Sequence, residues 1–176
     1  MDYVEKVRLP VRLAQPGLPP TDGFLMLVAR MEHEQRPETL MELVNAPRIV
    51  LPFIGTNEHD VALLVRANID WVAVGRDGRR DLLFPPGHRV THGQRMQLSF
   101  TNEDRIEALV QWDRTDPRVR LSDFLNACAD FFPVVASFGT LFVNRQRVRQ
   151  MRIADEAPQP LHDPAQGAGL DPGRRP

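Results

Sequence analysis

The chain has 176 residues, of which 42% are hydrophobic and 26% are charged, and its net charge is −1. This length fits one domain or two small ones, and the hydrophobic fraction is enough for a packed core, which excludes global disorder. No apolar stretch approaches the ~20 residues of a membrane helix, and residues 1–10 lack a signal peptide's apolar core. We therefore expect a cytoplasmic protein without membrane insertion. The single cysteine, Cys128, excludes an internal disulfide.

The first predicted elements are two strands followed by a short helix. Residues 7–14 alternate apolar and polar side chains, which is typical of a half-buried strand, and Pro10 on the outward face favours an edge position. Residues 23–31 predict a second strand after a proline-rich loop. The helix that follows has an apolar face formed by Leu40, Leu43 and Val44.

Two further segments complete this set of elements. Residues 49–54 are apolar and contain Pro52, which predicts a strand at an edge or a bulge. Residues 62–74 form a long strand-like segment whose midpoint, residues 66–68, is polar. That midpoint predicts a bend or tight turn between two strands.

The chain resembles itself at an offset of 81 residues, which places residues 23–53 over residues 104–134 without a gap. The second copy repeats the apolar helix stripe, a proline-containing strand and a closing segment with a polar midpoint. Asp123 lies where the first copy has Glu42. The signature of the predicted repeat is Leu40, Asn45 and Pro52 in the first copy, and Leu121, Asp123, Asn126, Pro133 and Asn144 in the second.

These elements predict a mainly β fold made of two tandem small barrel-like or sandwich-like units. Each unit has the order β-β-α-β-β with one short helix, and we expect the two to be related by a pseudo-twofold axis with shared or abutting cores. The first, divergent repeat covers residues 1–75, residues 76–93 are a linker, and the second repeat covers residues 94–153. Residues 154–176 are rich in Pro, Gly, Ala and Asp and predict a disordered tail.

The second copy carries a family resemblance. RLSDFLN at 120–126, FFPV at 131–134 and TLFVNRQRV at 140–148 resemble the pattern R-L-S-D-x-L-N, F-x-P, V-N-x-x-x-I of an uncharacterised bacterial family of small β domains. No activity is established for that family, so the resemblance implies a fold unit and no function. In the first copy, Thr39 replaces the Arg and Arg66 replaces the Asn of the closing V-N.

The order of strands is also similar, more distantly, to Sm-like small barrels. That resemblance implies RNA binding by rings of subunits. This chain departs from the Sm pattern because a helix occupies the middle loop, no glycine ends the closing turn and two copies are fused.

No catalytic, cofactor-binding or metal-binding residue is predicted, and we do not expect an enzyme. Ser122 has no G-x-S-x-G context and no glycine-rich phosphate loop occurs. His88 and His92 are four residues apart, but the prolines and glycines around them place them in loops. Cys128 falls on the apolar helix stripe and is expected to be a packed small hydrophobe. Asn126 is expected to supply a left-handed cap at the end of its helix, and Asp123, near the start, to interact favourably with the helix dipole.

The arginines carry the strongest compositional signal, because 21 of the 22 basic residues are Arg. Residues 1–75 have 7 basic and 10 acidic residues, residues 76–153 have 13 and 9, and residues 154–176 have 2 and 4. The net charge therefore hides an acidic first copy and a basic second copy. A cluster of arginines in the closing segment, with one more nearby in sequence, forms the candidate contact for an anionic ligand or a partner: Arg145, Arg147, Arg149, Arg152 and Arg120.

The function that this sequence favours is a non-enzymatic protein-interaction or assembly module, with a protein partner or a second copy of the chain as its ligand. The structural interpretation of the arginines is a solvated strand edge, where charge opposes edge-to-edge aggregation. The alternative is binding of RNA or a nucleotide through the Arg-rich closing strand of the second repeat. Few aromatic residues are placed to stack on bases, so this alternative has weaker support.

Overall fold

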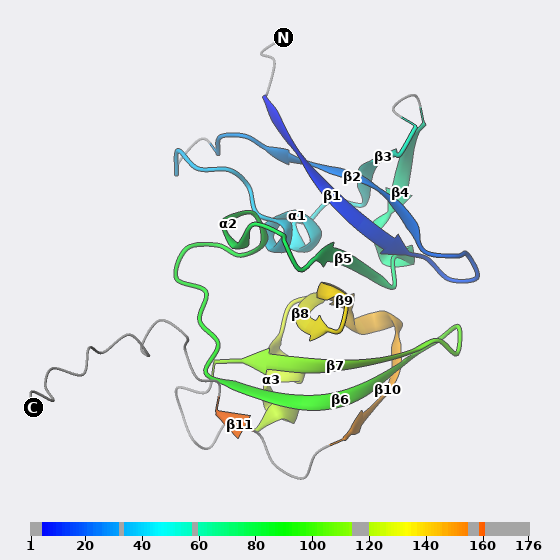
Figure 1. Ribbon diagram of the computed structural model, residues 1–176, viewed down its shortest axis with the longest axis vertical. Coiled ribbons are helices and arrows are strands. Elements are labelled where there is room, and N and C mark those ends of the chain that lie inside the picture. The colour runs from blue at the N-terminus through cyan, green and yellow to red at the C-terminus, as the bar shows by residue number, and fades with distance from the viewer. Residues whose placement is uncertain (1–4, 32–33, 58–59, 114–119, 155–158, 161–176) are drawn as a thin grey trace, which may run out of the picture.

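The computed structural model describes residues 5–31, 34–57, 60–113, 120–154 and 159–160, and it confirms a mainly β fold (Figure 1). We call residues 6–75 the N-terminal half. Its elements in chain order are β1 (Lys6–Ala14), β2 (Thr21–Val28), α1 (Leu40–Asn45), β3 (Val50–Gly55), β4 (Val61–Val65), the 3₁₀ helix η1 (Arg66–Asn68) and β5 (Trp71–Gly75).

The same order of elements occurs again in residues 92–153, which we call the C-terminal half. Its elements are β6 (His92–Phe100), β7 (Arg105–Trp112), α3 (Leu121–Ala127), β8 (Phe131–Ala136), β9 (Gly139–Asn144), the 3₁₀ helix η2 (Arg145–Arg147) and β10 (Val148–Ile153). A short helix, α2 (Arg80–Leu83), lies between the halves, and a two-residue strand, β11 (Gln159–Pro160), follows them.

All the described strands belong to one antiparallel sheet. Ten of them follow in the order β10-β6-β7-β8-β9-β5-β1-β2-β3-β4, and β11 pairs with β6. Figure 1 shows the N-terminal half in the upper part of the molecule and the C-terminal half below it. The halves meet where β5 pairs with β9, which joins the last strand of one half to the fourth strand of the other. The strand order therefore lacks the expected pseudo-twofold symmetry, because a twofold axis would join equivalent strands.

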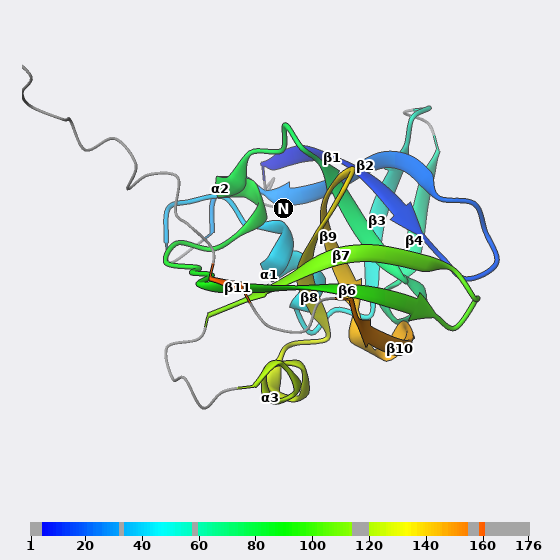
Figure 2. The same cartoon turned by 60° about the horizontal axis from the view of Figure 1, so that its bottom comes forward.

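The hydrophobic core consists of two clusters, and each contains residues from both halves. Phe131 and Phe142, from the C-terminal half, lie in the cluster formed mainly by the N-terminal half. In return, Ala14 and Trp71 lie in the cluster of the C-terminal half. Figure 2 shows α1 near the middle of the molecule and α3 at its periphery. The two halves therefore share apolar packing, as the sequence analysis expected.

The pattern of β1 explains why this strand forms. Leu9, Val11 and Leu13 are buried, and the residues that alternate with them, Arg8, Pro10 and Arg12, are exposed. β1 pairs with β2 along most of its length, and the guanidinium of Arg12 donates two hydrogen bonds of 2.8 Å to Asp22 on that neighbour. The period-2 alternation thus places one face of the strand in the core and leaves a charged face in water.

Pro52 and Pro133 lie in interior strands, which corrects the prediction of edge positions. β3 runs between β2 and β4, and β8 runs between β7 and β9. In each case pairing with the preceding strand begins only after the proline, at residues 53–55 in β3 and 134–136 in β8. Likewise, β5 pairs only with residues 12–14 of β1, beyond Pro10. The missing proline N–H is tolerated because each proline has a paired neighbour on one side only.

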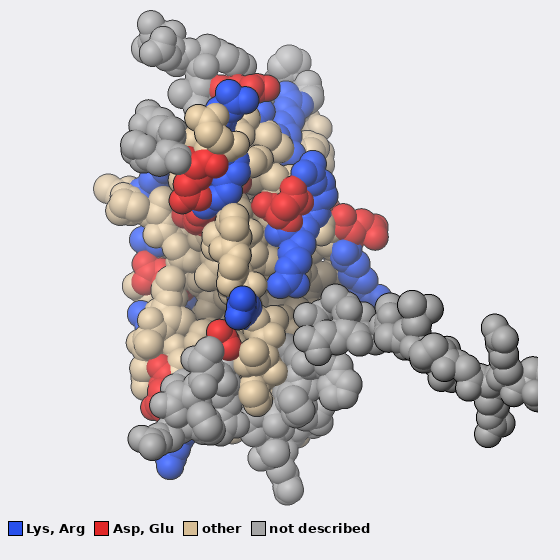
Figure 3. Space-filling view, turned by 90° about the vertical axis from the view of Figure 1, so that its left-hand side faces the viewer, with Lys and Arg blue, Asp and Glu red and all other residues tan. Residues whose placement is uncertain are grey.

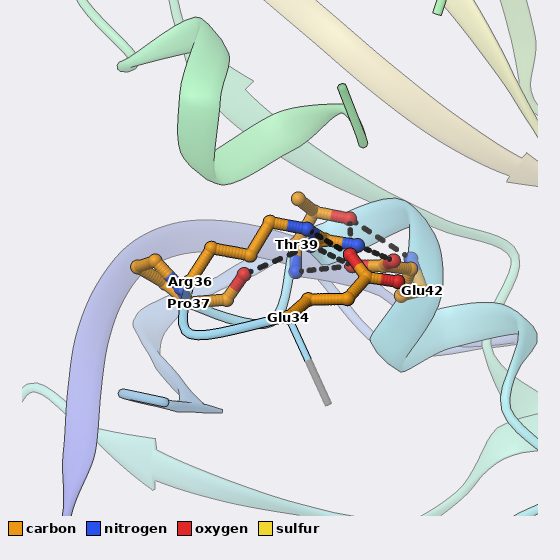
Figure 4. Close-up of polar contacts among 5 residues, drawn as sticks. All are labelled: Glu34, Arg36, Pro37, Thr39 and Glu42. Atoms are coloured by element: carbon orange, nitrogen blue, oxygen red, sulfur yellow. Dashed lines mark hydrogen bonds and ion pairs between the residues drawn. The ribbon is translucent and has the colours of Figure 1, made fainter. Parts of the chain in front are cut away.

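A network of charged and polar side chains fixes the start of α1 (Figure 4). Thr39 is the N-cap residue, and Glu42 accepts hydrogen bonds from its backbone N–H at 2.9 Å and its hydroxyl at 2.7 Å. Arg36 donates to both carboxylate oxygens of Glu42, at 2.9 and 2.6 Å. The hydrogen bonds from Arg36 lower the pKa of Glu42 to about 2, although partial burial opposes this shift. In α3, Asp123 accepts a hydrogen bond from the backbone N–H of Arg120 at 2.9 Å, which places its carboxylate at the start of the helix.

The Glu42→Gln variant is expected to be less stable than the wild type at pH 7 by about 1 kcal/mol, the typical loss on removing a helix cap. The folded pKa of Glu42 lies below its ordinary value of 4.5, so its stabilisation is complete above pH 4.5 and disappears as the pH falls towards 2. Urea unfolding measured between pH 7 and 2 should therefore show that the unfolding free energies of the wild type and the variant converge as the pH falls. Glu107→Gln, at an exposed position of β7, is the control. A difference that stays constant with pH would contradict this assignment.

The polar midpoints of both closing segments form the predicted bends, as the 3₁₀ helices η1 and η2. Arg66 Nη1 donates to the carbonyl of Val44 at 3.2 Å, and Arg145 Nη1 donates to that of Asn126 at 3.0 Å. Each arginine therefore binds carbonyls near the end of the helix in its own half. Arg66 corresponds to Arg145, and Val65 corresponds to Asn144, which corrects the alignment of Arg66 with the Asn of the family pattern.

The stretch predicted as a linker, residues 76–93, contributes to the core. It contains α2, whose Leu82 and Leu83 are buried in the cluster of the N-terminal half, and it ends in the first residues of β6. Of the predicted tail, residues 155–158 and 161–176 lie outside the described part of the chain. Three residues of the predicted tail are described: Ala154 and the two residues of β11, which pair with β6.

Candidate functional site

We call the pairing of β5 with β9 the junction, because it joins the two halves. Its register sets Trp71 opposite Val143 and Val72 opposite Phe142. Gly139, at the start of β9, has φ +149°, and an added Cβ there would lie only 2.0 Å from the carbonyl oxygen of Val74. Glycine is therefore required at this position, where the start of β9 lies against the backbone of β5. Around the ring of Phe142, Phe84 packs at 5.6 Å between ring centroids.

Buried polar contacts accompany the junction. Arg147 Nε donates to Asp70 Oδ1 at 2.9 Å, and the Asp70 side chain is 1% exposed. Burial raises the pKa of Asp70, and the hydrogen bond and charge of Arg147 oppose that rise. The buried side chain of Asn144 donates to the carbonyl of Ile69 at 3.0 Å. The partners in these two contacts are separated by 75 and 77 positions in the sequence, so the contacts hold one half against the other.

Asn45, at the end of α1, contacts the backbone of the other half. Its Oδ1 accepts from the N–H of Phe131 at 2.9 Å, and its Nδ2 donates to the carbonyl of the same residue at 3.0 Å. Nearby, Arg66 forms an ion pair with Asp130 at 3.1 Å. Among the described non-glycine residues only Gln35 and Glu103 have positive φ, so neither Asn45 nor Asn126 is the left-handed cap that the sequence predicts. Asn45 binds a neighbouring strand instead.

The outer strands of the sheet, β4 and β10, each pair with only one strand in the described part of the chain. Both correspond in position to junction strands: β4 is the fourth strand of its half, as β9 is, and β10 is the last strand, as β5 is. β4 and the residue before β3 expose apolar side chains at the sheet edge: Val61, Leu63, Val65 and Ile49. β10 exposes Arg149, Arg152 and Ile153.

Leu63 and Phe142 occupy equivalent positions in the two halves but differ in exposure. Leu63 pairs with Pro52, and Phe142 pairs with Pro133, the equivalent proline. Phe142 is completely buried because β5 and the segment after it cover β9, whereas Leu63 is 68% exposed. The edge of β4 therefore resembles the junction without its second strand.

The predicted arginines do not form one site. Arg145 binds the carbonyls of Leu125 and Asn126, and Arg147 binds Asp70. Arg149 and Arg152 are exposed on β10, and Arg120 lies at the start of α3. On the face drawn in Figure 3, basic and acidic side chains are intermingled, without a wide basic area. The structure thus separates the cluster into two structural arginines and three exposed ones.

Some equivalent residues of the predicted repeat signature have the same role in both halves, and others do not. Leu40 and Leu121 are buried at the first position of their helices. Asn126, unlike Asn45, is exposed, and no hydrogen bond joins its side chain to the described residues. Asp70, Asp130 and the exposed edge of β4 were not among the features predicted from the sequence. The only sequence signal for the last of these is the apolar run of residues 61–65, which is equally typical of an interior strand.

Comparison with protein-family models, curated proteins and solved structures found no match for this chain. Both resemblances stated for the second copy therefore stay predictions. Within the described residues, no group of three or more His, Cys, Asp and Glu side chains is placed to hold a metal ion. No helix of the described chain has the length and apolar character needed to cross a membrane.

Proposed function

We propose that this chain is a non-enzymatic assembly module made of two tandem small β units, and that its partner is a second copy of itself. In this proposal, β10 of one chain pairs with β4 of the next as β5 pairs with β9 inside each chain. The observation that carries it is the strand order, which leaves at the two ends of the sheet the counterparts of the two strands joined at the junction. Strand addition to an exposed edge satisfies backbone groups that otherwise face water.

Apolar side chains at both ends support this pairing. If the register of the junction is repeated between chains, Met151 faces Leu63 and Ile153 faces Val61. Ile153 is 59% exposed and Val61 is 60% exposed in the single chain, so the contact would remove both from water. Burial of such a side chain is worth about 1.5–3 kcal/mol. Exposed apolar residues in register at both edges are what a strand-pairing interface requires.

Asn126 supports the same arrangement. Within the chain, Asn45 binds the backbone of Phe131, the first residue of β8. At the 81-residue offset, Asn126 corresponds to Asn45 and Val50, the first residue of β3, corresponds to Phe131. The exposed amide of Asn126 would bind Val50 of the next chain with the same two hydrogen bonds.

The charge distribution favours this head-to-tail contact. Residues 1–75 have three more acidic than basic residues, and residues 76–153 have four more basic than acidic ones. A contact between the C-terminal half of one chain and the N-terminal half of the next therefore brings opposite net charges together. The contact should be weaker than the junction, where Arg66 forms an ion pair with Asp130. Between chains, Arg145 would take the place of Arg66 and Ile49 the place of Asp130, so this ion pair is lost.

The first experiment is sedimentation of the full chain over a wide range of protein concentrations. A mass that rises with concentration above the 20.0 kDa of one chain supports the proposal. A chain that remains at 20.0 kDa up to millimolar concentration contradicts it.

Two equivalent substitutions separate the roles of Asn45 and Asn126. The Asn45→Ala variant should lose about 1–3 kcal/mol of unfolding free energy, because the half-buried N–H of Phe131 loses its partner. The Asn126→Ala variant should unfold like the wild type and self-associate about 10-fold more weakly, which corresponds to about 1.4 kcal/mol. Urea unfolding measures the first effect, and sedimentation measures the second. Loss of stability in the Asn126 variant, with association unchanged, would rule out an intermolecular role for this amide.

Binding of RNA or a nucleotide is the second candidate, and Arg149 and Arg152, exposed on β10, are the observation that favours it. It is tested with a labelled single-stranded RNA at two salt concentrations, since phosphate contacts weaken steeply as salt rises. Salt-dependent binding that the double replacement of Arg149 and Arg152 by alanine abolishes would support this function over self-association. Failure to bind RNA leaves only the assembly proposal.

A further inference from the structure

A cavity of about 300 Å³ lies between α3, the end of β7 and the start of β8. Its walls include Trp112, Phe124, Phe132 and Cys128, and the segment that joins the two halves closes one side with His88. Met41, from α1 of the N-terminal half, also reaches it. The cavity is separate from the junction strands β5 and β9 and from both outer strands. Its size is at the lower end of the range for small-molecule sites, roughly 300–1,000 Å³.

Two residues that line this cavity each have a buried polar atom with no hydrogen-bond partner among the described residues. These atoms are the indole Nε1 of Trp112 and the ring Nε2 of His88. Trp112 is 1% exposed, so water at the molecular surface does not reach its N–H group. A buried donor without a partner destabilises a protein by about 1–3 kcal/mol, and such groups are rare in native structures. Two such atoms on residues that line one cavity suit a ligand with polar groups.

Aromatic side chains line the cavity beside these atoms and give it apolar walls. Phe124 is stacked on Trp112, with 6.3 Å between centroids and 25° between planes. His88 is stacked on Phe84 at 4.5 Å and 6°. Burial lowers the pKa of His88, so this ring is neutral at pH 7. Burial raises the pKa of Cys128, whose thiol donates to the carbonyl of Leu125 at 3.2 Å. Cys128 is therefore a wall of the cavity and not a nucleophile.

We propose that this cavity binds a small planar aromatic molecule that carries a carbonyl oxygen. The ring would pack among Trp112, Phe124 and Phe132, and the carbonyl would accept a hydrogen bond from the indole N–H of Trp112. His88 Nε2 offers a second polar contact, which suits an aromatic amide. This site is independent of self-association through β4 and β10. Because its walls come from both halves and from the segment between them, a bound ligand would also stabilise the contact between the halves.

The test uses the two tryptophans, Trp71 and Trp112, as reporters in the full chain. In ¹H–¹⁵N spectra of the labelled protein they give two indole signals, which the Trp112→Phe variant assigns. Benzamide is expected to move the Trp112 signal in a saturable manner and to leave the Trp71 signal in place. Toluene, which has the ring without the acceptor, is expected to bind at least about 10-fold more weakly, a factor that corresponds to ~1.4 kcal/mol. The same loss is expected when benzamide binds the Trp112→Phe variant.

Two results would overturn the proposal. If neither benzamide nor toluene moves the Trp112 signal at the highest soluble concentration, the cavity holds water only. If both bind the wild type equally, the cavity is an apolar space and the indole N–H does not select an acceptor. If the Trp112→Phe variant fails to fold, triple-resonance spectra of the wild type assign the two indole signals instead, so the comparison of benzamide with toluene remains decisive.

Discussion

The Arg147→Ala variant is expected to lose about 3 kcal/mol of unfolding free energy, because it leaves the carboxylate of Asp70 buried and without its ion pair. The value is at the lower end for a buried pair, since the Arg147 side chain is 23% exposed. Asp70 and Arg147 come from different halves, so the substitution also removes one of the contacts that hold the junction together. Chemical denaturation at pH 7 measures the change.

The matched control is Arg149→Ala, two residues further on and exposed on β10, which should change stability by less than about 0.5 kcal/mol. A second readout is the pH profile. Without Arg147, burial should raise the pKa of Asp70 further, so the variant's Asp70 becomes neutral at a higher pH than in the wild type. The variant therefore recovers stability as the pH falls through that pKa. Its unfolding free energy then differs less from that of the wild type. Equal losses in both variants, or no narrowing at low pH, would count against a buried ion pair.

The Leu63→Lys variant is expected to weaken self-association at least about 100-fold, which corresponds to ~2.7 kcal/mol. Lys at this position puts a charge at the centre of β4, on the edge that we propose to pair with β10, and charged edges oppose strand addition. The Leu63 side chain is 68% exposed, so the fold of the single chain should be unaffected. Sedimentation at matched concentrations measures the change in mass.

The control for this variant is Leu18→Lys, which makes the same replacement at another exposed leucine, in the loop between β1 and β2. It should associate like the wild type. The Leu63→Lys chain keeps an intact β10, so adding it in excess should shorten wild-type assemblies by pairing with their free β4 edges. If the two Lys variants associate equally, the proposed use of β4 is wrong. If excess Leu63→Lys chain has no effect on the wild type, the contact is not head-to-tail.

Local patterns predicted the elements of this fold well. The alternation in β1, the apolar stripe of α1 and the polar midpoint that became η1 are all properties of a few adjacent residues. The edge positions of Pro52 and Pro133 were wrong because a proline excludes only one backbone hydrogen bond. Whether that bond is needed depends on where pairing with the preceding strand, β2 or β7, begins, and the residues around the proline do not specify that point.

The candidate site was harder to predict for the same reason. Arg145, Arg147 and Arg149 alternate in the sequence, but η2 interrupts the strand and directs the first two towards structural partners. The partner of Arg147 is Asp70, 77 residues earlier, and the partner of Asn45 is Phe131, 86 residues later. Neither pair has a local signature. Only the order of strands in the sheet reveals which edges remain unpaired.

The non-equivalent junction has a consequence for how many chains an assembly can hold. Because β5 and β9 are different strands of their halves, repetition of the same contact between chains gives an assembly with a direction. Its two ends stay different, one with an unpaired β4 and one with an unpaired β10, and each accepts another chain until rotation at successive contacts brings the ends together. Each chain supplies two halves, so a closed assembly would contain an even number of halves, whatever the number of chains.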